Sequence, residues 1–178
     1  MKGLTMKMTV LLFCLILFVN SAYAEMPYDY PNQPNGFRNI LWGENLTKIK
    51  GMKKMDVSDE DSDIVTYARD QDALQIGAAK LDFIRYVAWK NKFSGVIIAF
   101  KGYANHEGLK ASLLEKFGKG KKHDYKNSLE WYGKDTTIIL DYNDVTREGS
   151  LMFYGNKIRA EADEYRKEKA KEGAEKGF

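Results

Sequence analysis

The chain has 178 residues, 44% of them hydrophobic, which is enough for one domain with its own core. Its formal net charge is +3 and falls to +1 without residues 1–24, which contain two lysines and no acidic residue, so a strong positive field for gathering nucleic acid is excluded. The single cysteine, Cys14, lies in the same segment, which excludes disulfides, thiol nucleophiles and thiolate metal sites from the rest of the chain.

The first 24 residues have the three parts of a secretory signal peptide. Lys2 and Lys7 make its start basic, and the apolar run at residues 10–19 is too short to span a bilayer core of about 30 Å. A small-x-small pattern ends at Ala24, which predicts cleavage between Ala24 and Glu25. An exported protein without disulfides is typical of a bacterial periplasm, so we expect the mature chain to be periplasmic, or else secreted.

Composition divides the mature chain into three parts. Residues 25–36 contain all three prolines and are expected to form an extended, unpacked leader. Residues 37–155 contain no proline and alternate apolar runs with Gly, Asn and Asp turns, as a continuous sheet-rich domain requires. Residues 156–178 are rich in charges of both signs and predict a C-terminal helix.

Within the domain, the apolar pattern predicts strands and two helices. Strands are expected at residues 37–42, 64–68, 73–76, 81–90, 93–100, 129–132, 136–142 and 150–154. Helices are expected at residues 44–50, ended by Gly51, and from the N-cap Asn105 to Phe117, ended by Gly118. The predicted fold class is therefore α+β, an antiparallel meander sheet with two helices on one face.

A weak internal similarity relates two lysine-rich segments. Residues 46–56 align with residues 114–124, and five of the eleven positions are identical. A duplicated strand–helix–meander unit would explain this, with a pseudo-two-fold axis between the halves. Chance similarity in a lysine-rich chain also explains it, and both interpretations stay open.

The C-terminal helix has a short apolar stripe at its start. Ile158, Ala162 and Tyr165 share one face, which predicts that the first turns dock on the domain. Ion pairs spaced i, i+4, such as Glu172 with Lys176, support the helix further on. The few apolar residues after Tyr165 do not make a packed or membrane-inserted face.

No motif for catalysis or cofactor binding occurs. The mature chain has two histidines, His106 and His123, and neither has a metal-ligand spacing. Phosphate loops, dinucleotide loops and nucleophile elbows are absent from the sequence. A hydrolase-type enzyme using His123 with Asp124 or Asp135 is an alternative, but we expect no catalytic residue and no cofactor.

One acidic run has the spacing of a calcium loop. Carboxylates stand at positions 1, 3, 5 and 12 of the pattern: Asp59, Asp61, Asp63 and Asp70. Position 6, where the loop needs a glycine, is Ile64, so we expect a solvated acidic turn and no metal.

Lysines and aromatic residues are the candidates for a ligand surface. Lysines gather at residues 48–54 and 116–122, just after the ends of the two predicted helices. Either they stabilise the helix dipoles there, or they form an anion-binding patch. Aromatic residues lie on or beside most strands, and either core packing or a sugar- or peptide-binding face accounts for them. The candidate binding residues are Tyr86, Trp89, Trp131, Tyr132, Lys119, Lys121 and Lys122.

The opening Phe37-x-x-Ile40-x-Trp42-Gly43 and the helix pattern of residues 109–118 resemble a family of small, uncharacterised, exported α+β proteins of Gram-negative bacteria. No activity is attached to that family. A similar duplicated layout of helix and meander occurs in envelope assembly factors and in β-lactamase-inhibitor-like domains, which is a likeness of fold alone.

Together these features predict a non-catalytic binding or adaptor module of the cell envelope. Its partner is expected to be an envelope protein or an acidic or saccharide ligand, with no nucleic acid and no transmembrane segment in the mature protein. An inhibitor of a secreted or periplasmic enzyme and a hydrolase using His123 are the alternatives.

Overall fold

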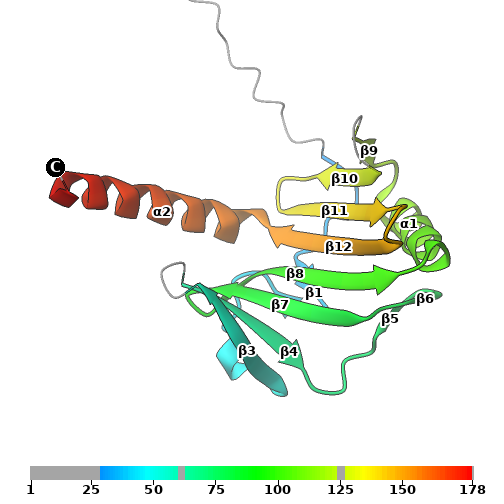
Figure 1. Cartoon of the computed structure of the whole chain (residues 1–178), viewed down its shortest axis with the longest axis horizontal. Coiled ribbons are helices and arrows are strands. Elements are labelled where there is room, and N and C mark those ends of the chain that lie inside the picture. Colours follow the sequence, from blue (N-terminus) through cyan, green and yellow to red (C-terminus); the bar gives the residue numbers. More distant parts are fainter. Residues whose placement is uncertain (1–28, 60–62, 124–126, 178) are drawn as a thin grey trace, which may run out of the picture.

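The computed structural model describes residues 29–59, 63–123 and 127–177 (Figure 1). The predicted signal peptide and its cleavage site between Ala24 and Glu25 lie outside the described residues. The described chain forms an eight-stranded antiparallel sheet in the order β3 (Met52–Asp59), β4 (Ile64–Arg69), β7 (Phe83–Trp89), β8 (Lys92–Lys101), β12 (Glu148–Gly155), β11 (Thr136–Asn143), β10 (Ser128–Tyr132), β9 (Lys121–Lys122). The other elements are the hairpins β1 (Gly36–Phe37) with β2 (Ile40–Leu41) and β5 (Gln75–Ile76) with β6 (Ala79–Lys80), the 3-10 turn η1 (Leu46–Lys48), and the helices α1 (Tyr103–Phe117) and α2 (Asn156–Gly177).

The sheet consists of two consecutive meanders, each preceded by a helical segment. The first, β3-β4-β7-β8, follows η1, and the second, β9 to β12, follows α1; the two meet where β12 pairs with β8. The predicted α+β class with a large antiparallel sheet and a C-terminal helix is confirmed. The two halves differ in detail, since η1 has three residues and α1 has fifteen, and the duplication stays a prediction.

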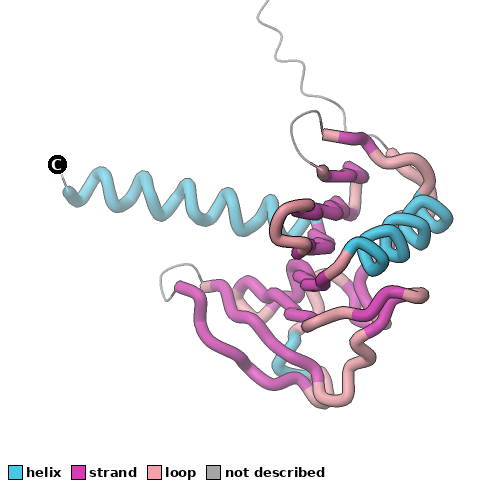
Figure 2. The backbone as a smooth tube through the Cα atoms, turned by 45° about the vertical axis from the view of Figure 1, so that its right-hand side comes forward, coloured by secondary structure: helices cyan, strands magenta, loops and turns pink. Residues whose placement is uncertain are grey.

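One face of the sheet, called the inner face here, carries the main core. Alternate side chains of the central strands point to it, such as Tyr86 on β7 and Ile98 on β8, because side chains alternate along a strand. Helix α1 packs on this face through Leu109, Leu113 and Phe117, which share one stripe of the helix. Figure 2 shows α1 lying on one side of the sheet.

The segment before the sheet also packs on the inner face, where an unpacked leader was expected. Tyr30 is only 2% exposed, donates a hydrogen bond from its hydroxyl to the carbonyl of Thr136 at 2.9 Å, and meets the ring of Phe117 edge-on. Trp42 packs on Phe93 with ring centroids 4.7 Å apart. The prolines stiffen this segment, but its aromatic side chains bury large areas, which offsets the cost of ordering it.

Several predictions of secondary structure are wrong in detail. The strand expected at residues 73–76 is only the two-residue β5, which pairs with β6 outside the large sheet. The strand expected at residues 37–42 is the β1–β2 hairpin, because Arg38 and Asn39 adopt positive φ angles of 50° and 65° and reverse the chain. The helix expected at residues 44–50 is the single 3-10 turn η1. Helix α1 begins two residues before the predicted N-cap Asn105, whose side chain bonds instead to the backbone of β6 and β8.

Helix α2 begins where β12 ends and extends away from the sheet (Figure 1). Ile158 and Ala162 are buried, and Tyr165 packs against the same small cluster around Trp89, which confirms the predicted docking of the first turns. No described side chain after Arg166 is buried. None of the described helices is both long enough and apolar enough to cross a membrane.

Candidate binding surface

Two of the aromatic candidates, Tyr86 and Trp131, lie in the core. Both are fully buried on the inner face. The Tyr86 hydroxyl donates to Asp72 at 2.8 Å, and the Trp131 indole donates to the carbonyl of Gly118 at 2.9 Å. Burial raises the pKa of the Tyr86 hydroxyl, and its hydrogen bond to Asp72 adds to that rise. These two rings stabilise the domain and are not part of a ligand surface.

The other two aromatic candidates, Trp89 and Tyr132, lie on the opposite, outer face of the sheet. Trp89 packs beneath α2 and is 7% exposed, whereas Tyr132 is half-buried near the turn between β10 and β11. Strands β8, β12 and β11 separate the two. The structure therefore places them on one face, at a distance from each other.

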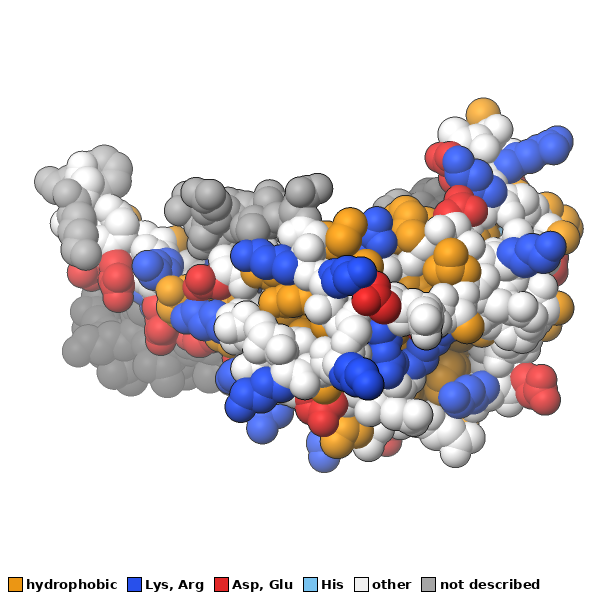
Figure 3. Space-filling view, turned by 90° about the horizontal axis from the view of Figure 1, so that it is seen from below, with side chains coloured by type: hydrophobic (Ala, Val, Ile, Leu, Met, Phe, Trp, Pro, Cys, Tyr) orange, Lys and Arg blue, Asp and Glu red, His pale blue; other side chains and the backbone are white. Residues whose placement is uncertain are grey.

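The lysine clusters lie at opposite edges of the sheet. Lys121 and Lys122 form the two-residue strand β9 at one edge, with Lys119 just before it, and Lys53 and Lys54 lie in β3 at the other edge. No strand was predicted at Lys53 and Lys54, and they belong to strand β3 because β4 pairs with them. In the view from below, Lys and Arg side chains are interspersed with hydrophobic ones (Figure 3). The two clusters do not form one anion-binding patch.

The pairing of His123 with Asp135 is not formed. The backbone amide of His123 donates to Ser128 at the start of β10, whereas Asp135 follows the end of that strand. About 13 Å of extended chain therefore lies between them. The other possible partner, Asp124, lies outside the described residues.

The acidic run does not converge on one point. The side chains of Asp59 and Asp61 lie outside the described part of the chain, and Asp63 and Asp70 flank opposite ends of β4, about 20 Å apart. Asp63 and Asp70 each face a lysine, at 3.8 Å and 2.9 Å respectively. Among the described residues there is no group of His, Cys, Asp or Glu that could hold a metal ion.

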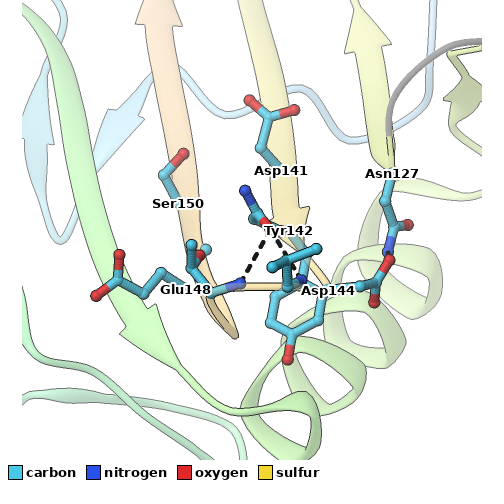
Figure 4. A pocket seen from close by; sticks show the side chains of 10 residues that line it. Asn127, Asp141, Tyr142, Asp144, Glu148 and Ser150 are labelled. Carbon is cyan, nitrogen blue, oxygen red and sulfur yellow. Dashed lines mark hydrogen bonds between the residues drawn. The ribbon is translucent and has the colours of Figure 1, made fainter.

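A hollow of about 690 Å³ lies at the turn between β11 and β12. Asp141, Asp144 and Glu148 line it, but Figure 4 shows their carboxylates pointing in different directions. The Asn143 side chain accepts hydrogen bonds from the amides two and three residues further on, at 2.9 and 3.1 Å (Figure 4). These polar groups shape the turn and do not converge on a ligand.

His106, on the first turn of α1, is buried against Tyr142, which also lines this hollow. The two rings stack with centroids 4.6 Å apart, and His106 is only 4% exposed. Glu107 Oε1 lies 3.2 Å from His106 Nδ1 but outside hydrogen-bonding geometry, so Nδ1 has no hydrogen-bond partner. Burial lowers the pKa of His106 by more than the neighbouring Glu107 raises it.

The outer face carries a row of apolar side chains on its central strands. Ile139, Met152 and Ile97 are cross-strand partners on β11, β12 and β8, and each is partly exposed. The described helices leave this outer apolar row accessible, because α1 packs on the inner face and α2 extends away from the sheet (Figure 1). Beyond the row, Phe83 on β7 is 37% exposed on the same face.

Two cavities flank the base of α2 beside this row. A cavity of about 190 Å³ between α2 and the strands β7 and β8 is lined by Trp89 and Arg166, among others. A second, of about 460 Å³, lies between α2 and the β10–β11 turn and is lined by Tyr132 and Ile139. Arg159 borders both. The outer apolar row, the two cavities and the base of α2 together form the candidate binding surface.

Sequence reasoning named Trp89 and Tyr132 on this surface and missed the other residues. Arg159 and Arg166 could have been recognised as a pair from the sequence, because a spacing of seven residues places both on one face of the predicted helix. The outer apolar row depends on the register between strands far apart in the chain, for which the sequence carries no local signal.

Comparison with known proteins finds no match to a protein-family model, to a curated protein or to a solved structure. The resemblance of the opening motif to exported α+β proteins therefore stays a prediction.

Proposed function

We propose that the protein is a non-catalytic binding module of the cell envelope that holds a partner protein on its outer sheet face, beside α2. The observation that carries this proposal is the outer apolar row, in which Ile139, Met152 and Ile97 lie in register across three central strands and are partly exposed. Contiguous apolar side chains on a surface are typical of interaction sites. The signal-peptide pattern of residues 1–24 supports the envelope location.

The charges around the outer apolar row are arranged along the strands. Arg159 and Arg166 lie at the end near α2, and Arg85 is the cross-strand partner of Ile97. At the opposite end, near the β11–β12 turn, Glu148 pairs with Lys101 at 3.1 Å, beside Asp141. A partner segment with an apolar strip and with acidic groups toward α2 would meet complementary charge at that end. Such complementarity orients association and selects the partner.

Site-specific photo-crosslinking in cells tests this proposal. A benzophenone amino acid at position 97 or 152 is expected to give the same adduct with one envelope protein, recovered from the periplasmic fraction. The matched control is position 145, because Val145 is 92% exposed but lies on the β11–β12 turn, away from the row. Ile139→Asp is expected to abolish the adduct, with the melting temperature measured alongside to show that the domain is folded.

Identical adducts from all three positions, or none from positions 97 and 152, would contradict the proposal. An adduct with a periplasmic enzyme whose activity falls on binding would make the module an inhibitor of that enzyme.

A further inference from the structure

Helix α2 docks through a small cluster and leaves a cavity beneath it. Ile158 and Ala162 of α2 are buried with Trp89 of β7, apart from the main core. The cavity between the helix and the sheet has a volume of about 190 Å³. Sites for drug-sized ligands usually exceed about 300 Å³, so this cavity fits a single small group.

The lining of this cavity combines apolar surface with positive charge. Val87, Trp89 and Ala162 supply apolar area, and the charged side chains that border the cavity are Arg159 and Arg166. The described lining residues include no carboxylate. Two arginines at the border of an apolar floor, one of them paired with Asp163, match a ligand that joins an anionic group to an apolar one.

The two arginines are held in place by contacts with their surroundings. The guanidinium of Arg159 lies 4.9 Å from the centre of the Tyr154 ring. Arg166 donates to the carboxylate of Asp163 at 2.6 Å and to the carbonyl of Ala162 at 3.3 Å. Each guanidinium has five N–H donors, so these contacts leave donors for a ligand.

Trp89 adds a donor that the protein does not satisfy. Its indole Nε1 is buried and has no hydrogen-bond partner, whereas the indoles of Trp42 and Trp131 both donate hydrogen bonds. An indole N–H acts only as a donor, and leaving it buried without an acceptor is unfavourable. The Trp89 ring lines the cavity, so a ligand that enters the cavity changes the surroundings of this indole.

We infer that this cavity binds a carboxylate carried on a small apolar group. The arginines pair with the carboxylate, because a planar guanidinium matches the geometry of a carboxylate, and the apolar group packs against Trp89 and Val87. A free amphipathic acid and the C-terminal residue of a partner peptide share this chemistry. This inference rests on the proposed function: the cavity is the part of the candidate binding surface next to α2, and the carboxylate is the chemical group that it recognises.

The indole resonances of the full chain provide the first test. Indole-3-acetate is expected to shift the Trp89 indole signal in ¹H–¹⁵N spectra, assigned with Trp89→Phe, and to leave the signals of Trp42 and Trp131 in place. For a ligand of this size we expect a Kd of about 1 mM. Indole-3-acetamide, which has the same shape without the charge, is expected to bind about tenfold more weakly.

Variants of α2 provide the second test. Arg159→Gln and Arg166→Gln are each expected to raise the Kd for indole-3-acetate about tenfold. Lys171→Gln is the matched control, because it removes a charge from the exposed part of α2 outside the cavity. A short peptide ending in Phe, prepared with a free and with an amidated C-terminus, distinguishes the two sources. If only the free form shifts the Trp89 signal, the ligand is the C-terminus of a partner peptide. If neither form shifts it, the ligand is a free amphipathic acid.

Three results would overturn the inference: no shift of the Trp89 signal, equal affinity for the acetate and the acetamide, or an unchanged Kd in both arginine variants. Each of these can occur while the crosslinks at positions 97 and 152 persist, so failure of the cavity inference is distinguishable from failure of the proposed function.

Discussion

Folding moves His106 into a stack with Tyr142, where burial lowers its pKa below the usual value of 6.5. Below about pH 6.5 the unfolded chain takes up a proton that the folded chain binds only at a lower pH. The unfolded state then binds more protons, so the free energy of unfolding falls. The stability linked to His106 is fully present above pH 6.5 and is lost as the pH falls through the pKa of the folded state.

His106→Phe keeps a flat ring in the stack and removes the titrating group. Between about pH 7.5 and about pH 5.5, we expect the wild type to lose more free energy of unfolding than His106→Phe, as measured by urea unfolding. His123→Gln controls for the second histidine and should retain the loss seen in the wild type. Equal losses in the wild type and His106→Phe would show that burial of His106 does not govern this pH range.

At the level of elements, α2 divides into a docked part and an exposed part. The Tyr165 ring lies 5.8 Å from that of Trp89, and the ammonium group of Lys90 lies 3.2 Å from the centre of the Tyr165 ring. Beyond Arg166 the described side chains are exposed. The stabilising contacts of this 22-residue helix with the domain therefore come from its first three turns.

Tyr165→Ala should lower the free energy of unfolding by about 1–3 kcal/mol, because it removes a ring from the docked cluster. Deletion of residues 167–178 should cost less than about 1 kcal/mol, because exposed ion pairs contribute little. Urea unfolding of both variants measures the difference. A deletion as costly as Tyr165→Ala would mean that the distal part of α2 belongs to the fold.

For the whole molecule, both open edges of the sheet carry lysines. Strand β9 is a two-residue edge made of Lys121 and Lys122. Strand β3 is longer, but it carries Lys53 and Lys54, and its pairing with β4 shifts register after Lys54. Short strands, edge lysines and bulges all discourage a second sheet from pairing at an edge.

Replacing both Lys53 and Lys54 with Val should therefore promote self-association through β3. We expect a higher mass than that of the wild type at equal concentration, measured by light scattering after size exclusion. Lys134→Val is the matched control, since Lys134 is exposed in the β10–β11 turn and not on an edge. If the double variant keeps the mass of the wild type, the lysines do not protect this edge.

The local parts of the fold were predictable from the sequence. The strands expected at residues 64–68 and 136–142 are β4 and β11. They were predictable because the alternation of apolar and polar residues and the β-branched residues that favour strands are local signals. The end of α1 at Gly118 and the docked start of α2 also follow from local patterns, a glycine stop and an apolar stripe.

The sequence by itself therefore determined the central strands, the end of α1, the docked start of α2 and two aromatic members of the candidate surface. Only the tertiary structure decided that Tyr86 faces the core while Trp89 faces α2, because both faces of residues 81–90 are apolar and alternation does not say which side is covered. Tyr30 is buried by contacts with residues about a hundred positions away, and Lys53 lies in a strand because β4 pairs with it. Such contacts depend on long-range packing and register, which local propensity does not encode.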